Sequence, residues 1–431
     1  MRAKKLYWIA ALALLLLALA LFLWHHRADE PESAPLAEKE TLRVAVVSDI
    51  HYTGERDYVY TGSFAAANDA SGTGKQVELL PSLLNAFVDE MLAQKTDLLL
   101  VTGDNAFNGA TVSHEALIEK LRPLRDAGIT VLTLPGNHDI NTAALCFPAG
   151  EAEETASPSP EEFAALYADY GYDAALARDE ASLSYVFDSG RGVRFFMLDT
   201  NFRYGAVYGR VSDDTLRWLK RELSACRDAG DRAVVAGHHN LLAHNPLFTF
   251  THTIDNSKAL CELLSEYGVN FFLSGHLHPQ SIVFQDGLYD IATESFAVYP
   301  HRYGLLELEE NGWRYTAQQT DVASWAAENG VSDDRLLRYD EYGAQFLYDA
   351  TFRQLAEELG GIQDEALRSE IGEQVALANV GYFVGEPSPA LDAALIDALS
   401  ENGLGFWAGY LSTVTDLPSS LNAEGMFPEG P

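Results

Sequence analysis

Polar side chains that can bind metal ions follow five apolar segments of strand length. The five groups are Asp49-x-His51, Gly103-Asp104, Gly136-Asn137-His138-Asp139, Gly237-His238-His239-Asn240 and Gly275-His276-x-His278. Carboxylate, amide and imidazole ligands suit Mn, Fe, Zn or Mg, and no cysteine motif favours a thiolate site. Each group alone has a structural explanation, because Gly-Asn is common in turns and a lone histidine is usually a core residue. Their recurrence at successive strand ends favours metal binding.

Asp104 is the residue around which these groups are expected to gather. The apolar run 98–101 is followed by Thr102-Gly103 and then by this carboxylate. Such a run is typical of a buried parallel strand, and ligands of open α/β sheets bind at the carboxyl ends of the strands. We therefore predict that Asp104 bridges two metal ions and that the other four strand ends converge on the same pair.

The elements that must position these residues alternate between strands and helices. Strands are predicted at 41–47, 98–101, 130–134, 193–200, 233–236 and 270–274, and shorter ones follow between 281 and 318. Apolar residues at helical spacing predict helices at 77–94, 113–127, 212–229 and 256–267. Ser113 and Ser212 are the expected N-caps, and Gly128 and Gly230 the expected stops. Residues 52–75 are interpreted as a long loop, and the whole pattern predicts an α/β fold.

The amino-terminal residues 1–27 are predicted to form a signal anchor. An apolar run at 6–24 follows Arg2, Lys4 and Lys5, and it is long enough to cross a bilayer. The cationic flank would stay in the cytoplasm, which makes this a single-pass cell-membrane protein with everything after residue 25 outside the cytoplasm. The alternative is a cleaved signal peptide and a secreted protein. Residues 28–40, rich in Glu, Pro and Ala, are interpreted as a linker.

The composition excludes some partners and leaves others open. A formal net charge of -34 argues against a nucleic-acid polymer as partner, but not against a small phosphate ester whose charge bound cations could neutralise. The three cysteines, Cys146, Cys226 and Cys261, have no CxxC spacing and are interpreted as buried, inert thiols, although one disulfide remains an alternative. No protein partner can be inferred.

The five groups, in this order, resemble the motifs of the calcineurin-like metallophosphoesterase superfamily over residues 41–320. The resemblance implies a sandwich of two β-sheets flanked by helices, with two divalent metal ions (Mn, Fe, Zn or Mg) at the strand ends. It assigns Asp49, His51 and His278 to one metal, Asn137, His238 and His276 to the other, and Asp104 to both. It further implies that a hydroxide bridging the metals attacks phosphorus, that His138 protonates the leaving oxygen, and that Asp139, His239 and Asn240 orient the ligands.

One position departs from the pattern of this superfamily. Many relatives carry an acidic residue three positions after the bridging aspartate, where it pairs with the motif histidine. Here that position is Phe107, so the partner of His138 is left open. The chain also lacks the Arg and the Gly-Asn-His-Glu block of the protein Ser/Thr phosphatase branch, which disfavours a protein phosphatase.

Residues 321–431 are predicted to form an all-helical carboxy-terminal domain, with helices at 333–359 and 364–378 and shorter ones at 391–399 and 404–410. This extension resembles the carboxy-terminal domain of bacterial cyclic-nucleotide-phosphodiesterase-like members. Core packing is preferred over a substrate wall as the role of Trp325, Tyr339 and Tyr342. The expected activity is hydrolysis of small phosphodiesters, with cyclic nucleotides as candidates. The alternatives are a phosphomonoesterase (nucleotidase or phosphatase) and a non-catalytic surface binding protein on the same fold.

Overall fold

The computed structural model describes residues 41–55, 57–71, 73–310, 312–385, 393–414 and 423–428. The predicted signal anchor (1–27) and linker (28–40) lie outside these residues, so both stay predictions. Among the residues that are described, no helix combines the length and the apolar character needed to cross a membrane.

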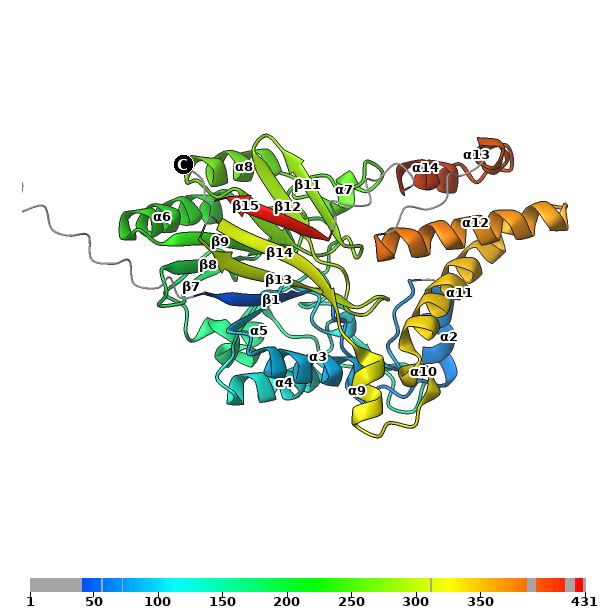
Figure 1. Ribbon diagram of the computed structural model, residues 1–431, viewed down its shortest axis with the longest axis horizontal. Coiled ribbons are helices and arrows are strands. Elements are labelled where there is room, and N and C mark those ends of the chain that lie inside the picture. The colour runs from blue at the N-terminus through cyan, green and yellow to red at the C-terminus, as the bar shows by residue number, and fades with distance from the viewer. Residues whose placement is uncertain are drawn as a thin grey trace, which may run out of the picture. The chain divides into compact units, whose positions relative to one another are not determined.

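Two β-sheets lie at the centre of the fold (Figure 1). The six-stranded sheet has the order β15-β14-β13-β1-β2-β3, in which β1, β2 and β3 run parallel and β13, β14 and β15 pair antiparallel. Its strands are β1 (Arg43–Val47), β2 (Leu98–Val101), β3 (Thr130–Thr133), β13 (Arg302–Glu309), β14 (Gly312–Gln319) and β15 (Glu424–Pro428).

The seven-stranded sheet has the order β11-β12-β10-β9-β8-β7-β6. Strands β8, β9, β10 and β12 are parallel, and β6, β7 and β11 pair antiparallel at the two sides. The strands are β6 (Ala177–Arg178), β7 (Tyr185–Asp188), β8 (Val193–Leu198), β9 (Arg232–Gly237), β10 (Phe271–Ser274), β11 (Ser281–Gln285) and β12 (Leu288–Ala292). A separate two-stranded ribbon joins β4 (Leu145–Cys146) to β5 (Glu153–Glu154).

Side chains of the central strands alternate between two apolar clusters. On β8, Phe195 and Met197 share a cluster with Val44 of β1, whereas Phe196 and Leu198 pack with Trp218. Successive side chains of a strand point to opposite faces, so one cluster lies against the other sheet and one lies under the helices. Helices α6 (Asp213–Ala229) and α8 (Ser257–Glu266) cover the second sheet, and α3 (Leu80–Gln94) and α4 (Thr111–Asp126) lie beside the first (Figure 1). The predicted α/β arrangement of two sheets with flanking helices is confirmed.

The start of α6 agrees with the prediction, whereas the start of α4 does not, because a distant segment bonds the first turn of α4. Helix α6 begins after Ser212, whose side chain accepts the Thr215 amide at 3.0 Å, and ends at Gly230 with φ 75°. Helix α4 instead begins at Thr111, two residues before the predicted cap. The Thr111 amide donates to the Ala156 carbonyl at 2.8 Å, so a distant segment satisfies the helix end and Ser113 lies inside the helix.

The predicted loop at 52–75 contains a helix, α2 (Gly62–Ser71). Its Phe64 is buried and stacks on Phe147, with ring centroids 4.6 Å apart, and it contacts Tyr58 and Phe107 edge-on or tilted. The loop prediction was wrong here because these contacts are with residues far along the chain, which local composition does not reveal.

The remaining helices are mostly carboxy-terminal. They are α9 (Val322–Glu328), α10 (Asp334–Leu337), α11 (Tyr339–Leu359), α12 (Glu365–Val384), α13 (Ala393–Glu401) and α14 (Gly405–Val414), with α5 (Pro160–Leu166), α7 (Thr249–His252), η1 (Phe107–Gly109) and η2 (Ala168–Tyr172) earlier in the chain. The prediction of an all-helical extension is wrong at its end, because β15 returns to the first sheet. There Phe427 pairs with Trp313 and packs on Phe271, with ring centroids 5.4 Å apart.

Tyr339, at the start of α11, packs in the main core, as predicted from the sequence. Its hydroxyl bonds the ring of buried His301, whose other ring nitrogen donates to the Phe296 carbonyl. Burial lowers the pKa of His301 to about 4, so the folded protein holds this ring neutral.

A measurable pH dependence of stability follows from this lowered pKa. A histidine whose pKa is lower in the folded protein stabilises the fold fully above its unfolded pKa of about 6.5, and this stability is lost as pH falls toward 4. Lowering the pH from 7 to 5 should therefore cost roughly 2 kcal/mol of unfolding free energy through His301 alone. We expect His301→Asn to lose correspondingly less stability over this interval in urea unfolding. Asn tolerates the left-handed backbone found there (φ 59°). Identical pH dependence in the two proteins would contradict the prediction.

Candidate metal centre

The predicted ligands come from the carboxyl ends of five parallel strands. Asp49 and His51 follow β1, Asp104 follows β2 and Asn137 follows β3, whereas His238 follows β9, and His276 and His278 follow β10. Backbone bonds tie these loops together: the Asp49 amide donates to the Gly103 carbonyl at 3.0 Å, and the Gly275 amide donates to the His238 carbonyl at 2.9 Å. The two sheets thus present their strand ends to one place.

Five of the seven predicted ligands have a left-handed backbone, although none is glycine. Their φ angles are 50° for Asp49, 45° for His51, 52° for Asp104, 63° for His276 and 78° for His278. Such a conformation costs of order 1–3 kcal/mol per residue and persists where the surrounding structure enforces it, most often at functional sites. The fold therefore holds the backbone of these residues in an unfavourable conformation, which fixes the directions in which their side chains leave the chain.

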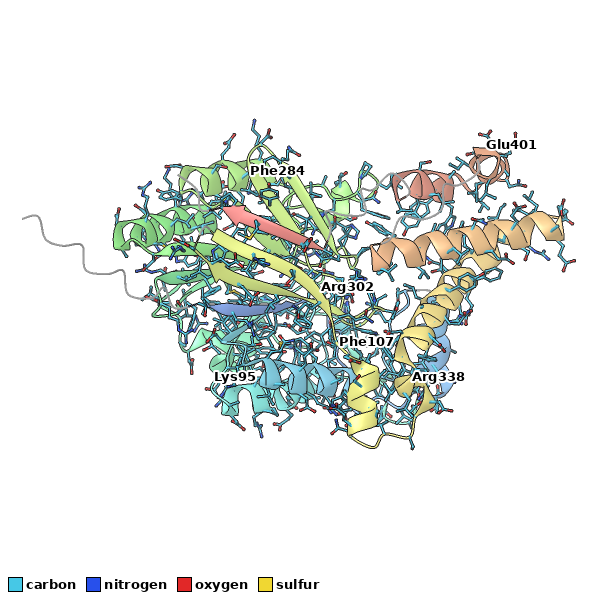
Figure 2. The ribbon with its side chains drawn as sticks, viewed as in Figure 1. Lys95, Phe107, Phe284, Arg302, Arg338 and Glu401 are labelled. Atoms are coloured by element: carbon cyan, nitrogen blue, oxygen red, sulfur yellow. The ribbon has the colours of Figure 1, made fainter. Side chains whose placement is uncertain are left out.

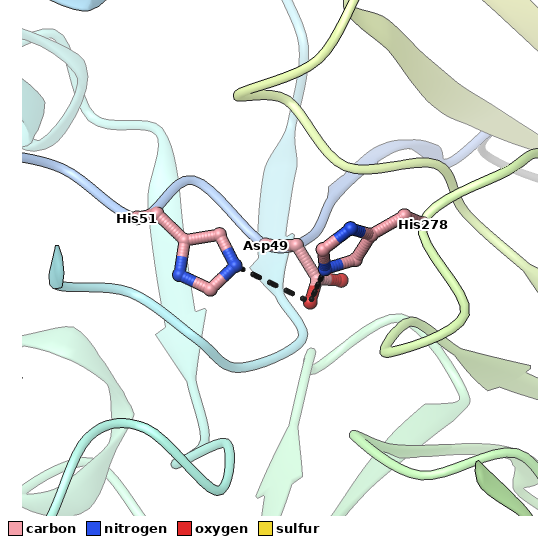
Figure 3. A group of neighbouring side chains, drawn as sticks. All are labelled: Asp49, His51 and His278. Carbon is pink, nitrogen blue, oxygen red and sulfur yellow. Dashed lines mark ion pairs between the residues drawn. The ribbon is translucent and has the colours of Figure 1, made fainter. Parts of the chain in front are cut away.

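Asp49, His51 and His278 form the first group of possible ligands (Figure 3). Asp49 Oδ1 lies 4.0 Å from His51 Nε2 and 3.6 Å from His278 Nε2. The other oxygen, Oδ2, accepts hydrogen bonds from the Ser48 hydroxyl at 2.6 Å and from the His276 amide at 2.9 Å, which fixes the carboxylate. Asp49 Oδ1 and His51 Nε2 are buried without a hydrogen-bond partner among the described residues. A cation between these atoms would satisfy them.

Asp104, His238 and His276 form the second group, with Asn137 beside it. The proton positions of both imidazoles follow from their backbone partners. His238 Nδ1 donates to the Thr102 carbonyl at 3.0 Å and His276 Nε2 to the Thr251 carbonyl at 3.1 Å, because a carbonyl can only accept. The other ring nitrogens, His238 Nε2 and His276 Nδ1, are therefore the lone-pair atoms of the neutral rings.

When both rings are neutral, these lone pairs face one another with no proton between them. His238 Nε2 lies 3.1 Å from His276 Nδ1 and 3.1 Å from Asn137 Oδ1. Donor atoms of one metal ion lie roughly 3 Å apart, since each bond is about 2.1 Å long. The set of acceptors thus fits a divalent cation better than it fits a hydrogen-bond network.

Asp104 belongs to the second group and also faces a member of the first. Its Oδ2 is 3.8 Å from His51 Nε2 in the first group and 3.5 Å from His238 Nε2 in the second. Its Oδ1 accepts the His138 amide at 2.9 Å, which holds the carboxylate in place. This is the position that a carboxylate shared by two cations would need.

Burial and neighbouring charges shift the pKa values of the four predicted imidazole ligands, and His238 differs in direction from the other three. Burial lowers the pKa values of His51, His276 and His278 well below the usual range, so these rings are neutral bases, the form that binds metals. Burial also opposes protonation of His238, but the carboxylates of Asp104 and Asp49 outweigh it and raise its pKa. The centre of the site therefore attracts positive charge.

The three predicted orienting residues lie behind the ligands. Asp139 accepts the amides of Gly136, Asn105 and Ala106 at 2.8, 3.1 and 3.1 Å and so joins the loops after β2 and β3. Asn240 donates to the Ser274 hydroxyl at 2.9 Å and the Gly275 carbonyl at 3.0 Å, which supports the loop after β10.

The third of them, His239, bonds Thr200 through Nδ1 at 2.8 Å and packs its ring on His276, with centroids 4.5 Å apart. All three therefore contact the segments that carry ligands, which is where an orienting residue must lie.

Two glycines of the motifs lie so close to neighbouring side chains that no other residue fits at their positions. A Cβ on Gly136 would lie 2.2 Å from Asp104 Oδ1, and one on Gly275 would lie 1.8 Å from Ser48 Oγ. Any side chain at either position would displace a predicted ligand or its support.

His138 has a contact with a predicted ligand but none with an acid that could orient its ring, among the residues that the structure describes. Its ring is exposed, stands edge-on to His51 with centroids 5.5 Å apart, and has no hydrogen-bond partner among the described residues. Phe107 instead joins Tyr58 and Phe64 in the aromatic contacts that anchor α2. At this position the chain thus has an aromatic ring that packs in the core, and among the described residues no carboxylate bonds the ring of His138.

Lys75 is a residue that the sequence analysis missed. Its segment lies beside the ligand loops, because the Gln76 amide donates to the Ala297 carbonyl at 2.8 Å and Lys75 pairs with Val298. The pKa of Lys75 is lowered by burial, and its charge lowers the pKa values of His51 and His278. Nothing in the local sequence distinguishes it from other lysines, since it ends a segment interpreted as a loop.

The chain was compared with known proteins. Residues 42–280, more than half of the chain, match the family model described as Calcineurin-like phosphoesterase. A 3',5'-cyclic-nucleotide phosphodiesterase from Nostoc sp. is 26% identical over 244 residues, which are 56% of this chain and 74% of that protein. A probable cyclic nucleotide phosphodiesterase from Xenorhabdus bovienii is 23% identical over 186 residues, 43% of this chain and 62% of the relative.

Among solved structures, a dimetal phosphatase from Danio rerio aligns with a TM-score of 0.47 at 14% identity, covering 65% of this chain and 96% of that one. The family match spans every predicted ligand and the strands that carry them. The chain belongs to the calcineurin-like phosphoesterase family and is a metallophosphoesterase.

Proposed function

We propose that the protein hydrolyses small-molecule phosphodiesters, with 3',5'-cyclic nucleotides as candidate substrates, at a centre of two divalent metal ions. The observation that carries this proposal is the position of Asp104, whose Oδ2 faces Nε2 of His51 and of His238, one from each ligand group. The two weakly similar phosphodiesterases support the choice of a diester. Bound cations would activate a water molecule and neutralise charge on the phosphoryl oxygens.

The residues of this chain supply the positioning and the proton. Asp49, His51 and His278 would hold one cation, Asn137, His238 and His276 the other, and Asp104 both. The water oxygen forms a bond to phosphorus while the bond from phosphorus to the leaving oxygen breaks. The exposed imidazole of His138 can give its proton to that oxygen and regain one from solvent, because no protein group in the described residues occupies its ring nitrogens.

The test is a comparison of diester and monoester substrates with the full chain and added Mn²⁺. We expect kcat/KM for bis-p-nitrophenyl phosphate to exceed that for p-nitrophenyl phosphate by at least about tenfold, and cyclic AMP to be hydrolysed. A higher kcat/KM for the monoester than for the diester would identify a phosphomonoesterase instead. No metal-dependent hydrolysis of either ester would overturn the proposal.

The same assay examines the role of His138. Replacing His138 by Ala should lower kcat by about 10²-fold or more for cyclic AMP, whose leaving alkoxide needs a proton. The loss should be much smaller for bis-p-nitrophenyl phosphate, since p-nitrophenolate leaves without one. Equal losses for both substrates would indicate that His138 positions the phosphate rather than donating a proton.

A further inference from the structure

A cavity of about 290 Å³ lies beside the metal ligand His278, and its walls are mainly aromatic. Its aromatic side chains are Phe248, Tyr382, Phe383, Phe406, Trp407 and Tyr410. Phe248 comes from the segment before α7, and the other five come from helices α12 and α14, more than 130 residues later in the chain. The segment and the two helices lie near one another in Figure 1. None of these residues belongs to the five motifs.

The cavity borders the metal centre at a predicted ligand. His278, a predicted ligand, lines it together with Leu277 and Pro279 of the same loop. On the other side, the ring of His252 lines the cavity and packs on the ring of the ligand His276, with centroids 4.7 Å apart. A molecule whose phosphate sits between the two ligand groups can therefore extend into this cavity.

Hydrogen bonds position two of the aromatic side chains, and a third, Phe406, is exposed. Trp407 donates from its indole nitrogen to Glu358 at 3.1 Å, and the Tyr410 hydroxyl donates to Asn379. The ring of Phe406 is nearly parallel to that of Tyr410, at 10°, and 56% of Phe406 is exposed. An exposed, prearranged aromatic surface stacks well on flat rings and costs little ordering entropy on binding.

The polar groups of the cavity suit a neutral, flat ligand. Among the described residues that line it there is no Asp, Glu, Lys or Arg, whereas the exposed Gln354 supplies an amide that can both donate and accept hydrogen bonds. A nucleobase combines a stacking face with donor and acceptor edges, and stacking on protein aromatics is a general mode of base binding.

We propose that this cavity binds the nucleobase of a nucleotide substrate while its phosphodiester lies at the metal centre. The site favours nucleoside phosphates over phosphate esters that lack a base, and it assigns this preference to α12 and α14. This inference rests on the proposed phosphodiesterase function and refines its substrate class.

The test uses two competitive inhibitors of bis-p-nitrophenyl phosphate hydrolysis by the full chain with Mn²⁺. AMP and ribose 5-phosphate share the sugar and the phosphate and differ in the base. We expect AMP to inhibit about tenfold more tightly than ribose 5-phosphate. In Phe406→Ala this ratio should fall toward one through weaker AMP inhibition, with the inhibition constant of ribose 5-phosphate unchanged, whereas Phe406→Trp should keep the preference.

Phe284→Ala is the matched control, because Phe284 on β11 is 57% exposed, like Phe406, and does not line the cavity (Figure 2). It should leave both inhibition constants as in the unaltered protein. Two results would overturn the proposed base-binding site in a protein that hydrolyses the diester. One is equal inhibition by AMP and ribose 5-phosphate, and the other is a preference for AMP that is unchanged in Phe406→Ala. Failure of the proposed function would appear differently, as absence of metal-dependent diester hydrolysis in the unaltered protein.

Discussion

Replacing Asp104 by Asn is expected to lower kcat for bis-p-nitrophenyl phosphate by about 10³-fold or more. The isosteric amide keeps the size of the side chain but removes the negative charge that faces His51 and His238 at 3.8 and 3.5 Å. A pair of cations stabilises the transition state of phosphoryl transfer by several kcal/mol, and each 1.36 kcal/mol is a factor of ten in rate. Losing the shared ligand should therefore remove most of the catalysis.

Metal content should change together with the rate. The unaltered protein is expected to retain two metal ions per chain after gel filtration, measured by elemental analysis, and Asp104→Asn fewer. Asp169→Asn serves as the control, because Asp169 forms an exposed ion pair with Arg125 and such pairs contribute little. A variant of Asp104 that keeps more than a tenth of the rate with full metal content would rule out a shared carboxylate.

Removing the metal ions is expected to abolish hydrolysis and to lower the thermal midpoint of unfolding by several degrees. His238 Nε2 lies 3.1 Å from both His276 Nδ1 and Asn137 Oδ1. Asp49 Oδ1 and His51 Nε2 are buried without hydrogen-bond partners in the described structure. A ligand that binds only the folded state stabilises it by about 4 kcal/mol at a thousand times its dissociation constant. Chelation should reverse this stabilisation.

Differential scanning calorimetry before and after dialysis against EDTA measures the shift, and added Mn²⁺ should restore both midpoint and activity. In Asp104→Asn the shift should be smaller, since the ligand groups no longer share a carboxylate. An unchanged midpoint after verified metal removal would show that the buried acceptors are satisfied in another way.

Much of the site could be predicted from the sequence, because ligand chemistry is a property of residue type. Aspartate, asparagine and histidine after apolar runs indicated cations, and parallel strands bring their carboxyl ends to one edge. The side chains predicted as ligands do come together in two groups that face Asp104. The left-handed backbone of His51 or His278 could not be predicted, because it arises from bonds between loops that only the folded chain brings together.

The failures share one cause, which is contact between segments far apart in the chain. The amide of Thr111 bonds Ala156, so α4 does not begin at the expected cap, and Phe427 returns to pair with Trp313 in a region expected to be all helical.

The sequence alone determined which residues can bind metal and which strands carry them, since both depend on residue type and local apolar pattern. Only the tertiary structure decided that Phe107 packs against Tyr58, that Lys75 lies beside the ligand loops, and that aromatic rings of α12 and α14 wall a cavity next to His278. These features depend on burial between distant segments, and no local pattern encodes which apolar surfaces will meet.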